Sequence, residues 1–342
     1  MPTKRQEQIF KIIVENYIKE PYPVSSKAIC DMLKCSSATV RAEMSELENL
    51  GLIEKTHTSS GRVPSEYGYR YYVDNIMTPR EVNVNETLEL QKVVNSKNLM
   101  ISDVIEKSME IISELTNYTA IVLGKSAINN RVNKVEVIPI DEQNLVAIIV
   151  TDKGHVEHKN IYIDSIVDIN DIKKTVEIIN KFIVGNLVKD VPAILEYDVK
   201  PIIANYIQQH EALYNAFYTV FNDFTNSESI KVSGTKNILM QPEFSDADKI
   251  RQILNKFEDK TLIKSIEEKE NGVNVYIGRE NNFDDDVTVI KTKYTLNGEE
   301  GTIALIGPKR MEYDRVISLL NYITDNIEGG KWKSRLKKWM KN

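Results

Sequence analysis

Residues 57–77, HTSSGRVPSEYGYRYYVDNIM, combine a polar turn, an arginine at Arg62 directly after it and a run of tyrosines. Gly61 has no Cβ, so its backbone can take positive φ and lie close to a phosphate group. The guanidinium of Arg62, expected at the tip of the turn, can pair with phosphate oxygens or enter the narrow minor groove of A·T-rich DNA. An ordinary surface turn has a similar composition, so the residues before this stretch must decide between the two interpretations.

Two helices are predicted before residue 34. Apolar residues at three- and four-residue spacing indicate a helix over residues 4–19, which Pro21 and Pro23 end. Ser25 or Ser26 then offers a side-chain oxygen as the N-cap of a second, short helix. The apolar positions of this second helix are Ala28, Ile29, Met32 and Leu33.

A third helix is predicted after a break at Lys34 and Cys35. Ser36 or Ser37 is expected to cap it, and it runs to about residue 50. Gly51 follows directly and suits the residue that ends a helix. The apolar positions of the third helix are Val40, Met44 and Leu47.

Two short helices joined by a tight turn form the helix-turn-helix pattern that reads the major groove of DNA. Leu52 and Ile53 would begin a strand into the turn of residues 57–62, which makes the unit a winged helix. The alternative is a small helical domain whose third helix serves only as core. The residues expected to face DNA are Ser36, Ser37, Thr39, Arg41, Ser45, His57, Ser59, Gly61 and Arg62.

Charge argues against a strongly basic DNA-binding module. Residues 1–80 contain eleven Lys or Arg and ten Asp or Glu, so their net charge is about plus one. Glu43, Glu46 and Glu48 are expected to lie away from the proposed DNA face, where Arg41, Lys55, His57 and Arg62 gather. A nearly neutral module makes few phosphate contacts and binds weakly alone. We therefore expect a homodimer that reads two half-sites.

The remaining chain alternates between helices and short strands. Residues 79–101 resemble a linker, and a helix follows from Ser102. Strands at 135–163 form a three-stranded antiparallel meander by their turn signals, with helices at 169–184 and 201–224 after it. The strand at 119–123 lacks a local partner, so we expect it to join a later sheet built from strands at 273–277, 287–294 and 301–307. The domains expected are 1–78, a winged helix; 102–130 with 231–330, an interrupted α/β domain; 131–230, an insertion; and 331–342, a basic tail.

The helix at 201–224 carries more apolar surface than a three-stranded sheet can cover. Its aromatic residues either pack on a neighbouring domain or form a dimer seam. They are Tyr206, Tyr214, Phe217, Tyr218, Phe221 and Phe224.

Patterns typical of enzymes are missing. The sequence has no P-loop, dinucleotide fingerprint, HExxH helix or GxSxG elbow, so we expect no catalytic residue and no cofactor. His155 and His158 would point to opposite faces of a strand, which disfavours a joint metal site. The acidic run 284–286 is expected to be a solvated hairpin tip and not a cation site. The two cysteines, Cys30 and Cys35, provide no disulfide framework.

The tail GGKWKSRLKKWMKN has six Lys or Arg, no acidic residue and both tryptophans of the chain. Trp332, Leu336, Trp339 and Met340 stand at helical spacing. The tail could bind DNA, an anionic membrane or an acidic partner, or it could pack on the α/β domain. The N-terminus lacks an apolar leader and no run of eighteen apolar residues occurs, so we expect a cytoplasmic protein.

Residues 24–77 closely resemble the HrcA family of bacterial heat-inducible transcription repressors, above all in THTSSGRVP and GYRYYVD. The resemblance implies an α+β multidomain chain: a winged helix, then a GAF-like domain that an inserted dimerisation domain interrupts. It also implies binding to an inverted-repeat operator called CIRCE ahead of chaperone genes, with activity assisted by the GroE chaperonin.

The sequence departs from the family pattern at two positions. Ala42 stands where members usually carry asparagine, and Ser60 stands where they usually carry alanine. Loss of an asparagine from the reading helix removes one potential contact, so the operator recognised can differ. The alternative function is a metabolite-responsive winged-helix regulator, with the GAF-like domain as the effector sensor. A further alternative, an enzyme with a DNA-binding appendage, lacks any supporting motif.

Overall fold

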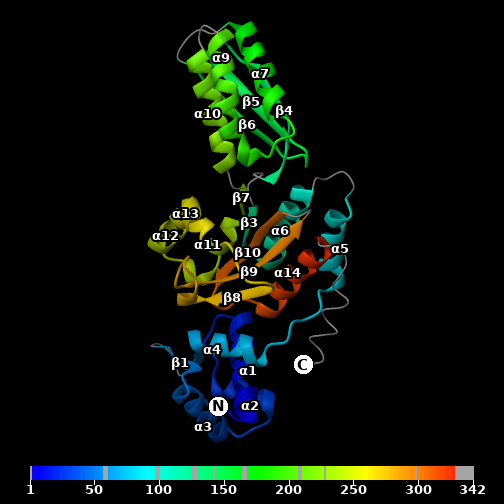
Figure 1. Cartoon of the computed structure of the whole chain (residues 1–342). Helices are drawn as coiled ribbons and strands as arrows, with labels where there is room; N and C mark the ends of the chain where they lie inside the picture. The colour runs from blue at the N-terminus through cyan, green and yellow to red at the C-terminus, as the bar shows by residue number, and fades with distance from the viewer. Residues whose placement is uncertain are drawn as a thin grey trace. The chain divides into compact units, whose positions relative to one another are not determined.

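The computed structural model describes residues 2–56, 61–96, 101–124, 129–141, 143–163, 168–206, 210–226, 229–296 and 299–327. The chain divides into two units, one of residues 1–123 and 230–342 and the other of residues 124–229. The first unit combines an N-terminal winged helix with an α/β domain, and the second is an insertion within that α/β domain (Figure 1).

The winged helix begins with three helices and ends with a two-stranded sheet. The helices are α1 (Lys4–Lys19), α2 (Ser26–Leu33) and α3 (Ser37–Asn49), and strand β1 (Ile53–Lys55) pairs antiparallel with β2 (Arg62–Pro64). Apolar side chains from all three helices share one core, as the periodicity of the sequence predicts.

The ends of these helices follow from local chemistry. The Ser25 side chain accepts a hydrogen bond from the backbone at the start of α2, and the Ser36 side chain does the same for α3. Both caps are among those predicted from the sequence. Lys34 adopts a left-handed conformation in the turn between α2 and α3, and Gly51 has φ +73° directly after α3. The helix-turn-helix prediction is therefore confirmed in its details.

The tyrosine run forms a helix that the sequence analysis did not predict. Helix α4 (Glu66–Tyr71) continues without a break into one turn of π-helix, Tyr72–Ile76. Tyr69 and Tyr72 are buried, whereas Tyr67 points outward. Gly68 allows α4 to pack against β1, because a Cβ there would lie 2.0 Å from the carbonyl oxygen of Leu52.

The range expected to be a linker contains helix α5 (Val84–Val94), which Asn83 and Glu86 cap reciprocally. The Glu86 carboxylate is only 2% exposed and pairs with Arg315 at 2.7 Å and Arg80 at 3.2 Å. The hydroxyl of Ser318 also donates to the carbonyl of Arg80. This segment is thus anchored to the α/β domain, because a buried carboxylate requires its basic partners.

The α/β domain is built on a five-stranded sheet with the order β7-β3-β10-β9-β8. Its strands are β3 (Thr119–Gly124), β7 (Ser229–Ser233), β8 (Val273–Ile277), β9 (Val287–Leu296) and β10 (Glu299–Pro308). The prediction that the strand at 119–123 joins the later sheet is confirmed, since β3 lies between β7 and β10.

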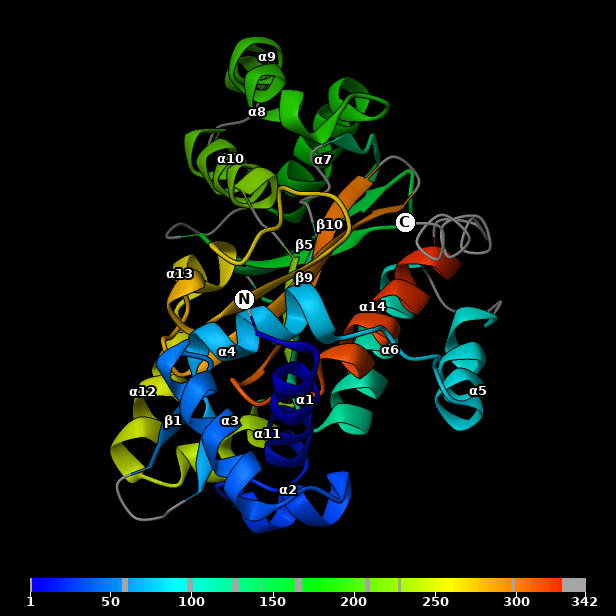
Figure 2. The same ribbon diagram turned by 90° about the horizontal axis from the view of Figure 1, so that it is seen from below.

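Helices cover both faces of this sheet (Figure 2). On one face, α6 (Ile101–Thr116) and α14 (Tyr313–Ile327) pack over Ala120 and Val122. On the other face, the cluster around Ile121 and Leu123 includes side chains from α11 (Thr235–Leu239), α12 (Ala247–Glu258) and α13 (Lys260–Lys264). Alternate residues of β3 therefore face opposite layers, and the layers together form a GAF-like domain.

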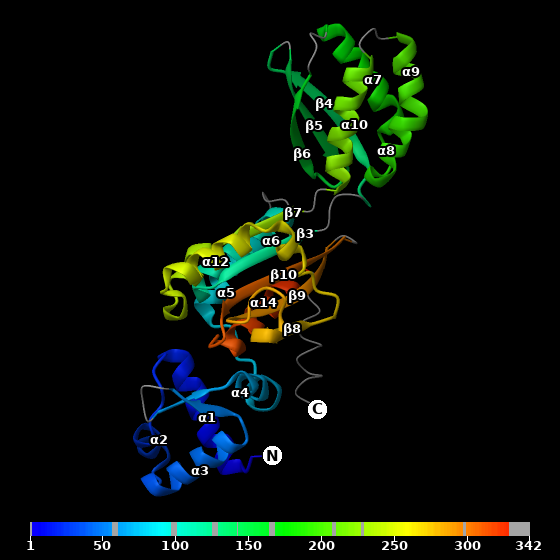
Figure 3. The same ribbon diagram turned by 90° about the vertical axis from the view of Figure 1, so that its left-hand side faces the viewer.

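The inserted unit has an antiparallel sheet, and its described helices pack on one face of that sheet (Figure 3). Strands β4 (Val132–Pro139), β5 (Asn144–Thr151) and β6 (Val156–Tyr162) pair in the order of the chain, as the meander prediction requires. The covering helices are α7 (Ile169–Ile183), α8 (Val191–Ile194), α9 (Lys200–Tyr206) and α10 (His210–Asn226).

The apolar surface of α10 is buried within its own unit. Tyr214, Phe217, Val220 and Phe221 are all buried in the cluster that α7 and β5 share. For Tyr214, Phe217 and Phe221, the prediction of a dimer seam or of cover for a neighbouring domain is wrong, because α7, α8 and α9 present apolar surface to α10. The side chains of Tyr206 and Phe224 lie outside the described residues.

Phe221→Ala is expected to destabilise the inserted unit by about 3–5 kcal/mol, because it removes a fully buried ring and leaves a cavity. Urea denaturation followed by circular dichroism measures this free energy of unfolding. The matched control is Tyr197→Ala, since the Tyr197 side chain is 77% exposed. Equal stability of the two variants would contradict the assigned core.

Candidate nucleic-acid interface

The start of α3 presents small polar side chains to solvent. Ser36 and Ser37 are exposed, and Thr39 is half-buried. The Ser36 hydroxyl lies 2.8 Å from that of Thr39 and accepts from the Thr39 amide at 3.1 Å. This arrangement satisfies a backbone amide at the start of α3 and leaves the Ser37 hydroxyl available to a partner.

One face of α3 carries the residues expected to read DNA. Ser37, Arg41 and Ser45 are spaced by four residues and all three are exposed. The neighbouring face, formed by the predicted apolar positions, is buried. Arg41 is held toward the start of α2, because its Nε donates to the Ser26 hydroxyl at 3.4 Å. Sequence reasoning proposed Ser26 only as a helix cap and missed this contact.

The base of the wing is packed more tightly than a free turn. Gly61 is buried, and a Cβ at this position would lie 2.7–2.8 Å from the backbone of Pro23. Its φ is not positive, unlike that of Gly51. The expectation that Gly61 serves the turn through positive φ is wrong; the glycine is required for close approach to the segment before α2. His57 and Ser59, also expected at the DNA face, lie outside the described residues.

Arg62 is placed inside the returning strand and not at the tip. It pairs with Lys55 in the β1–β2 ladder, and its amide and carbonyl bond to Val24 at 2.9 and 2.8 Å. The guanidinium is 13% exposed and binds Glu48 of α3, with a shortest distance of 2.8 Å. Lys55 approaches the same carboxylate at 3.6 Å.

The expected separation of charges is therefore incomplete. Glu48 was expected to lie away from the basic cluster, yet it lies between Arg62 and Lys55. One carboxylate shared by two cations leaves about one positive charge at the base of the wing. Additional exposed cations that the sequence analysis did not assign are Lys27 and Lys34, at the two ends of α2.

No candidate metal site accompanies this surface in the described part of the chain. Groups of three or more His, Cys, Asp or Glu that could hold a metal ion are absent there. The acidic run 284–286 lies in the connection between β8 and β9 with Asp285 exposed, as expected for a solvated tip, but basic side chains pair with its carboxylates. Asp284 binds Lys256 at 2.5 Å, Asp286 binds Lys249 at 2.6 Å, and Asp285 lies 3.8 Å from Arg279. The pKa of Asp286 is lowered, chiefly by the hydrogen bond from Lys249.

A small cavity of about 70 Å³ lies beside β8 and β9 in the α/β domain. Polar residues Tyr276, Glu280 and Lys291 line it together with the apolar Ile266 and Phe283. This volume is far below the roughly 300–1,000 Å³ of typical small-molecule sites. Among the described helices, none has the length and hydrophobicity needed to cross a membrane.

Two short helices, a third helix with an exposed polar face and a two-stranded wing define the winged-helix class of DNA-binding proteins. Comparisons with known proteins extend this assignment. A family model described as "Winged helix-turn-helix transcription repressor, HrcA DNA-binding" matches residues 1–72, and "HrcA protein C terminal domain" matches residues 102–317. The chain belongs to the HrcA family, and is thus a DNA-binding transcription repressor and not an enzyme.

Two individual proteins illustrate the similarity. The "Heat-inducible transcription repressor HrcA" of Bacillus pumilus (strain SAFR-032) is 36% identical over 333 residues, which cover 96% of this chain and 97% of the relative. A solved structure described as a hypothetical protein is 22% identical. It covers 96% of this chain and 98% of its own with a TM-score of 0.66, so it supports the fold alone.

Arg62→Ala and Glu48→Gln separate two roles of the wing arginine. If Arg62 contacts DNA, Arg62→Ala weakens binding to the inverted-repeat operator about tenfold. It also reduces the slope of log affinity against log salt concentration by about the value for one phosphate contact. Glu48→Gln removes the competing carboxylate, so it should tighten binding at low salt. Titrations of gel mobility at two salt concentrations measure both effects.

The matched control for these variants is Arg251→Ala, which removes an exposed arginine from α12. Thermal unfolding shows whether each variant remains folded. Unchanged operator affinity of folded Arg62→Ala would contradict a DNA contact at the wing and leave Arg62 with a structural role, as in its pairing with Glu48.

Proposed function

We propose that this chain is a heat-inducible repressor that binds as a homodimer to an inverted-repeat operator of the CIRCE type ahead of chaperone genes. A GroE-type chaperonin assists its activity, and heat releases it from the operator. The observation that carries the proposal is the exposed Ser37–Arg41–Ser45 face of α3, in a chain with near full-length similarity to a heat-inducible repressor. A repressor works where the chromosome lies, so we place the protein in the cytoplasm.

The proposed contacts divide between α3 and the wing. Ser36, Ser37, Thr39, Arg41 and Ser45 approach base edges or nearby phosphates in the major groove. His57, Ser59, Gly61 and Arg62 approach the backbone or the minor groove from the wing. Repression follows because the bound dimer occludes the promoter.

Electrostatics supports a dimer as the binding form. The net charge of residues 1–80 is about plus one, and Glu48 offsets part of the positive charge of the wing. Non-specific attraction to phosphate is therefore weak for one module. Two linked modules on two half-sites gain affinity because the second binding step is intramolecular.

The inserted unit offers a surface for the second copy. The face of its sheet that the described helices leave uncovered is called the open sheet face, and its residues alternate with the buried ones along each strand. Ile138 is 47% exposed there, and Val156 is also exposed. The residues of this face are Lys134, Glu136, Ile138, Val146, Ile148, Val150, Val156, His158, Asn160 and Tyr162.

A second copy of this chain fits the open sheet face better than an unrelated partner. Lys134 and Glu136 lie side by side on it with opposite charges. A two-fold axis through the face would bring Lys134 of one copy toward Glu136 of the other, so the face is self-complementary. Its apolar centre, Val146, Ile148 and Val150, is flanked by these polar residues, as in dimer interfaces.

Ile138→Glu is expected to weaken dimerisation at least tenfold, because each copy then carries an unpaired carboxylate into the proposed interface. Analytical ultracentrifugation over a range of concentrations measures the dissociation constant. The matched control is Ile169→Glu, which changes a 52% exposed isoleucine at the first turn of α7. A dimer that tolerates Ile138→Glu as well as Ile169→Glu contradicts the use of this face.

Footprinting upstream of chaperone genes tests the function itself. The native protein is expected to protect an inverted repeat at the growth temperature, to lose protection after a heat step, and to regain it when chaperonin is added. Comparing two temperatures with and without chaperonin separates intrinsic heat sensitivity from dependence on the chaperonin. Absence of protection on any inverted repeat under all four conditions would contradict the proposal.

The metabolite-responsive alternative has one supporting observation, the cavity beside β8 and β9. Its volume of about 70 Å³ accommodates a few waters or a small ion, so a metabolite would require the pocket to open. Thermal-shift screening with small carboxylates and phosphates separates the alternatives, since a ligand that binds the native state raises its melting temperature.

A further inference from the structure

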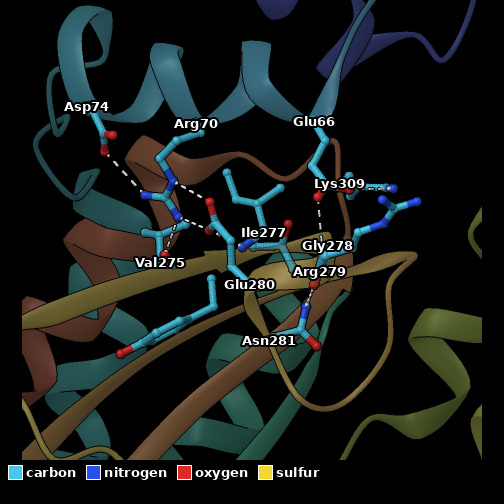
Figure 4. Close-up of polar contacts among 12 residues, drawn as sticks. Glu66, Arg70, Asp74, Val275, Ile277, Gly278, Arg279, Glu280, Asn281 and Lys309 are labelled. Carbon is cyan, nitrogen blue, oxygen red and sulfur yellow. Dashed lines mark hydrogen bonds and ion pairs between the residues drawn. The ribbon is translucent and has the colours of Figure 1, made fainter.

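Helix α4 of the winged helix carries two oppositely charged side chains that contact the α/β domain. Glu66 and Arg70 are four residues apart, so they lie on the same side of the helix. Both reach the segment that ends β8 and the 3-10 turn Gly278–Glu280 after it (Figure 4). We call these contacts the clasp; its members are Glu66, Arg70, Val275, Gly278, Arg279, Glu280 and Lys309.

Arg70 forms the first half of the clasp. Its Nε donates to one oxygen of Glu280 at 3.0 Å, and a terminal nitrogen donates to the other oxygen and to the Val275 carbonyl. Another terminal nitrogen binds Asp74 at 3.2 Å, which orients the guanidinium from its own helix. The Glu280 carboxylate also accepts from the Ile277 amide at 2.9 Å. A guanidinium group that binds both oxygens of a carboxylate fixes the direction of the contact as well as its length.

Glu66 forms the second half. Its carboxylate accepts from the Arg279 amide at 3.3 Å and from the Lys309 ammonium at 3.2 Å. Gly278 makes room for it, since a Cβ there would lie 2.2 Å from a Glu66 oxygen, and its φ is +53°. The glycine thus serves both the turn and the approach of α4.

The charged forms of Arg70 and Glu280 are favoured. Burial alone raises the pKa of Glu280, but the hydrogen bonds from Arg70 and the Ile277 amide outweigh it and lower that pKa. Burial alone lowers the pKa of Arg70, and the contacts with Glu280 and Asp74 raise it overall. The Arg70–Glu280 pair therefore stays ionised at neutral pH, and its contribution to stability is lost as the pH falls through the lowered pKa of Glu280.

Apolar packing joins the same elements, since Tyr69, Ile277 and Tyr313 lie in one cluster of buried residues. Tyr69 of α4 contacts Tyr313 with ring centroids 6.0 Å apart. The Tyr69 hydroxyl is buried, and it has no hydrogen-bond partner among the described residues. An unsatisfied buried hydroxyl opposes docking. The polar contacts of the clasp add direction to this packing, because both oxygens of Glu280 bind Arg70.

We infer that Glu66 and Arg70 are positioning residues for operator binding. The clasp fixes the winged helix on the α/β domain and thereby sets the direction in which each copy of a dimer presents α3. This inference rests on the dimeric operator binding proposed above. None of the clasp residues belongs to α3 or to the wing, so they act on DNA only through this orientation.

The inference makes a distinct prediction for two DNA duplexes. A single half-site needs only one module, whereas the full inverted repeat needs two modules held at the right spacing and angle. Arg70→Glu and Glu280→Arg should each lower affinity for the inverted repeat at least tenfold and change affinity for a single half-site less than twofold. The double variant restores the opposite charges and should recover most of the affinity for the inverted repeat.

The experiment uses the full chain with fluorescence anisotropy on both duplexes, and ultracentrifugation confirms that each variant is dimeric. The matched control is Arg251→Glu, which reverses the charge of an exposed arginine on α12. Glu66→Gln is the second variant, because it removes the attraction to Lys309 without changing size; a severalfold loss on the inverted repeat alone is expected.

Three outcomes would overturn the inference. One is that the single variants keep the native preference for the inverted repeat. Another is that they lose as much affinity for the single half-site as for the inverted repeat. The third is that the folded double variant fails to recover. A native protein that binds both duplexes equally contradicts dimeric operator binding itself, and the role of the clasp falls with it. That result differs from failure of the clasp alone. In that case the native protein binds the inverted repeat more tightly than the single half-site, and the variants show the same preference.

Discussion

The return of the chain to the sheet it left at β3 is the constraint on which the rest of the structure depends. More than one hundred residues separate β3 from β7, yet the two strands are neighbours. Buried hydrogen bonds hold this junction: Asn237 donates to the Ser113 carbonyl at 3.1 Å, and Thr119 donates to the Gly234 carbonyl at 3.1 Å. Because the two ends of the insertion emerge from adjacent strands, the inserted unit can fold around its own core without disturbing the α/β domain.

Local chemistry made much of this arrangement predictable. Ser25, Ser36 and Gly51 mark helix ends because each satisfies or terminates a backbone hydrogen-bond pattern within a few residues. The joining of β3 to the later sheet followed from its lack of a local partner. Helix α4 was missed, because tyrosines also favour strands, and α5 was missed because its buried stripe is narrow.

Contacts between distant side chains were beyond sequence reasoning. The pairing of Glu48 with Arg62 depends on how a helix and a strand meet, and no spacing in the sequence encodes it. The same holds for the acidic run 284–286, where lysines of α12 lie against the carboxylates. In both places an apparent excess of one charge is balanced by the opposite charge from another element. Net charge over a sequence window therefore overstates the field that a partner experiences.

The close contact of Gly61 with Pro23 has a consequence for how this protein can diverge. A methyl group at residue 61 would meet backbone atoms, which cannot rotate away as a side chain can. The wing base and the segment entering α2 must therefore move and evolve together, with Val24 and Arg62 joined by two backbone hydrogen bonds. New operator preferences are then accessible chiefly through exposed positions of α3 such as Ala42, where substitution costs no packing. Within one small domain, different residues therefore determine which operator is recognised and how the fold is maintained.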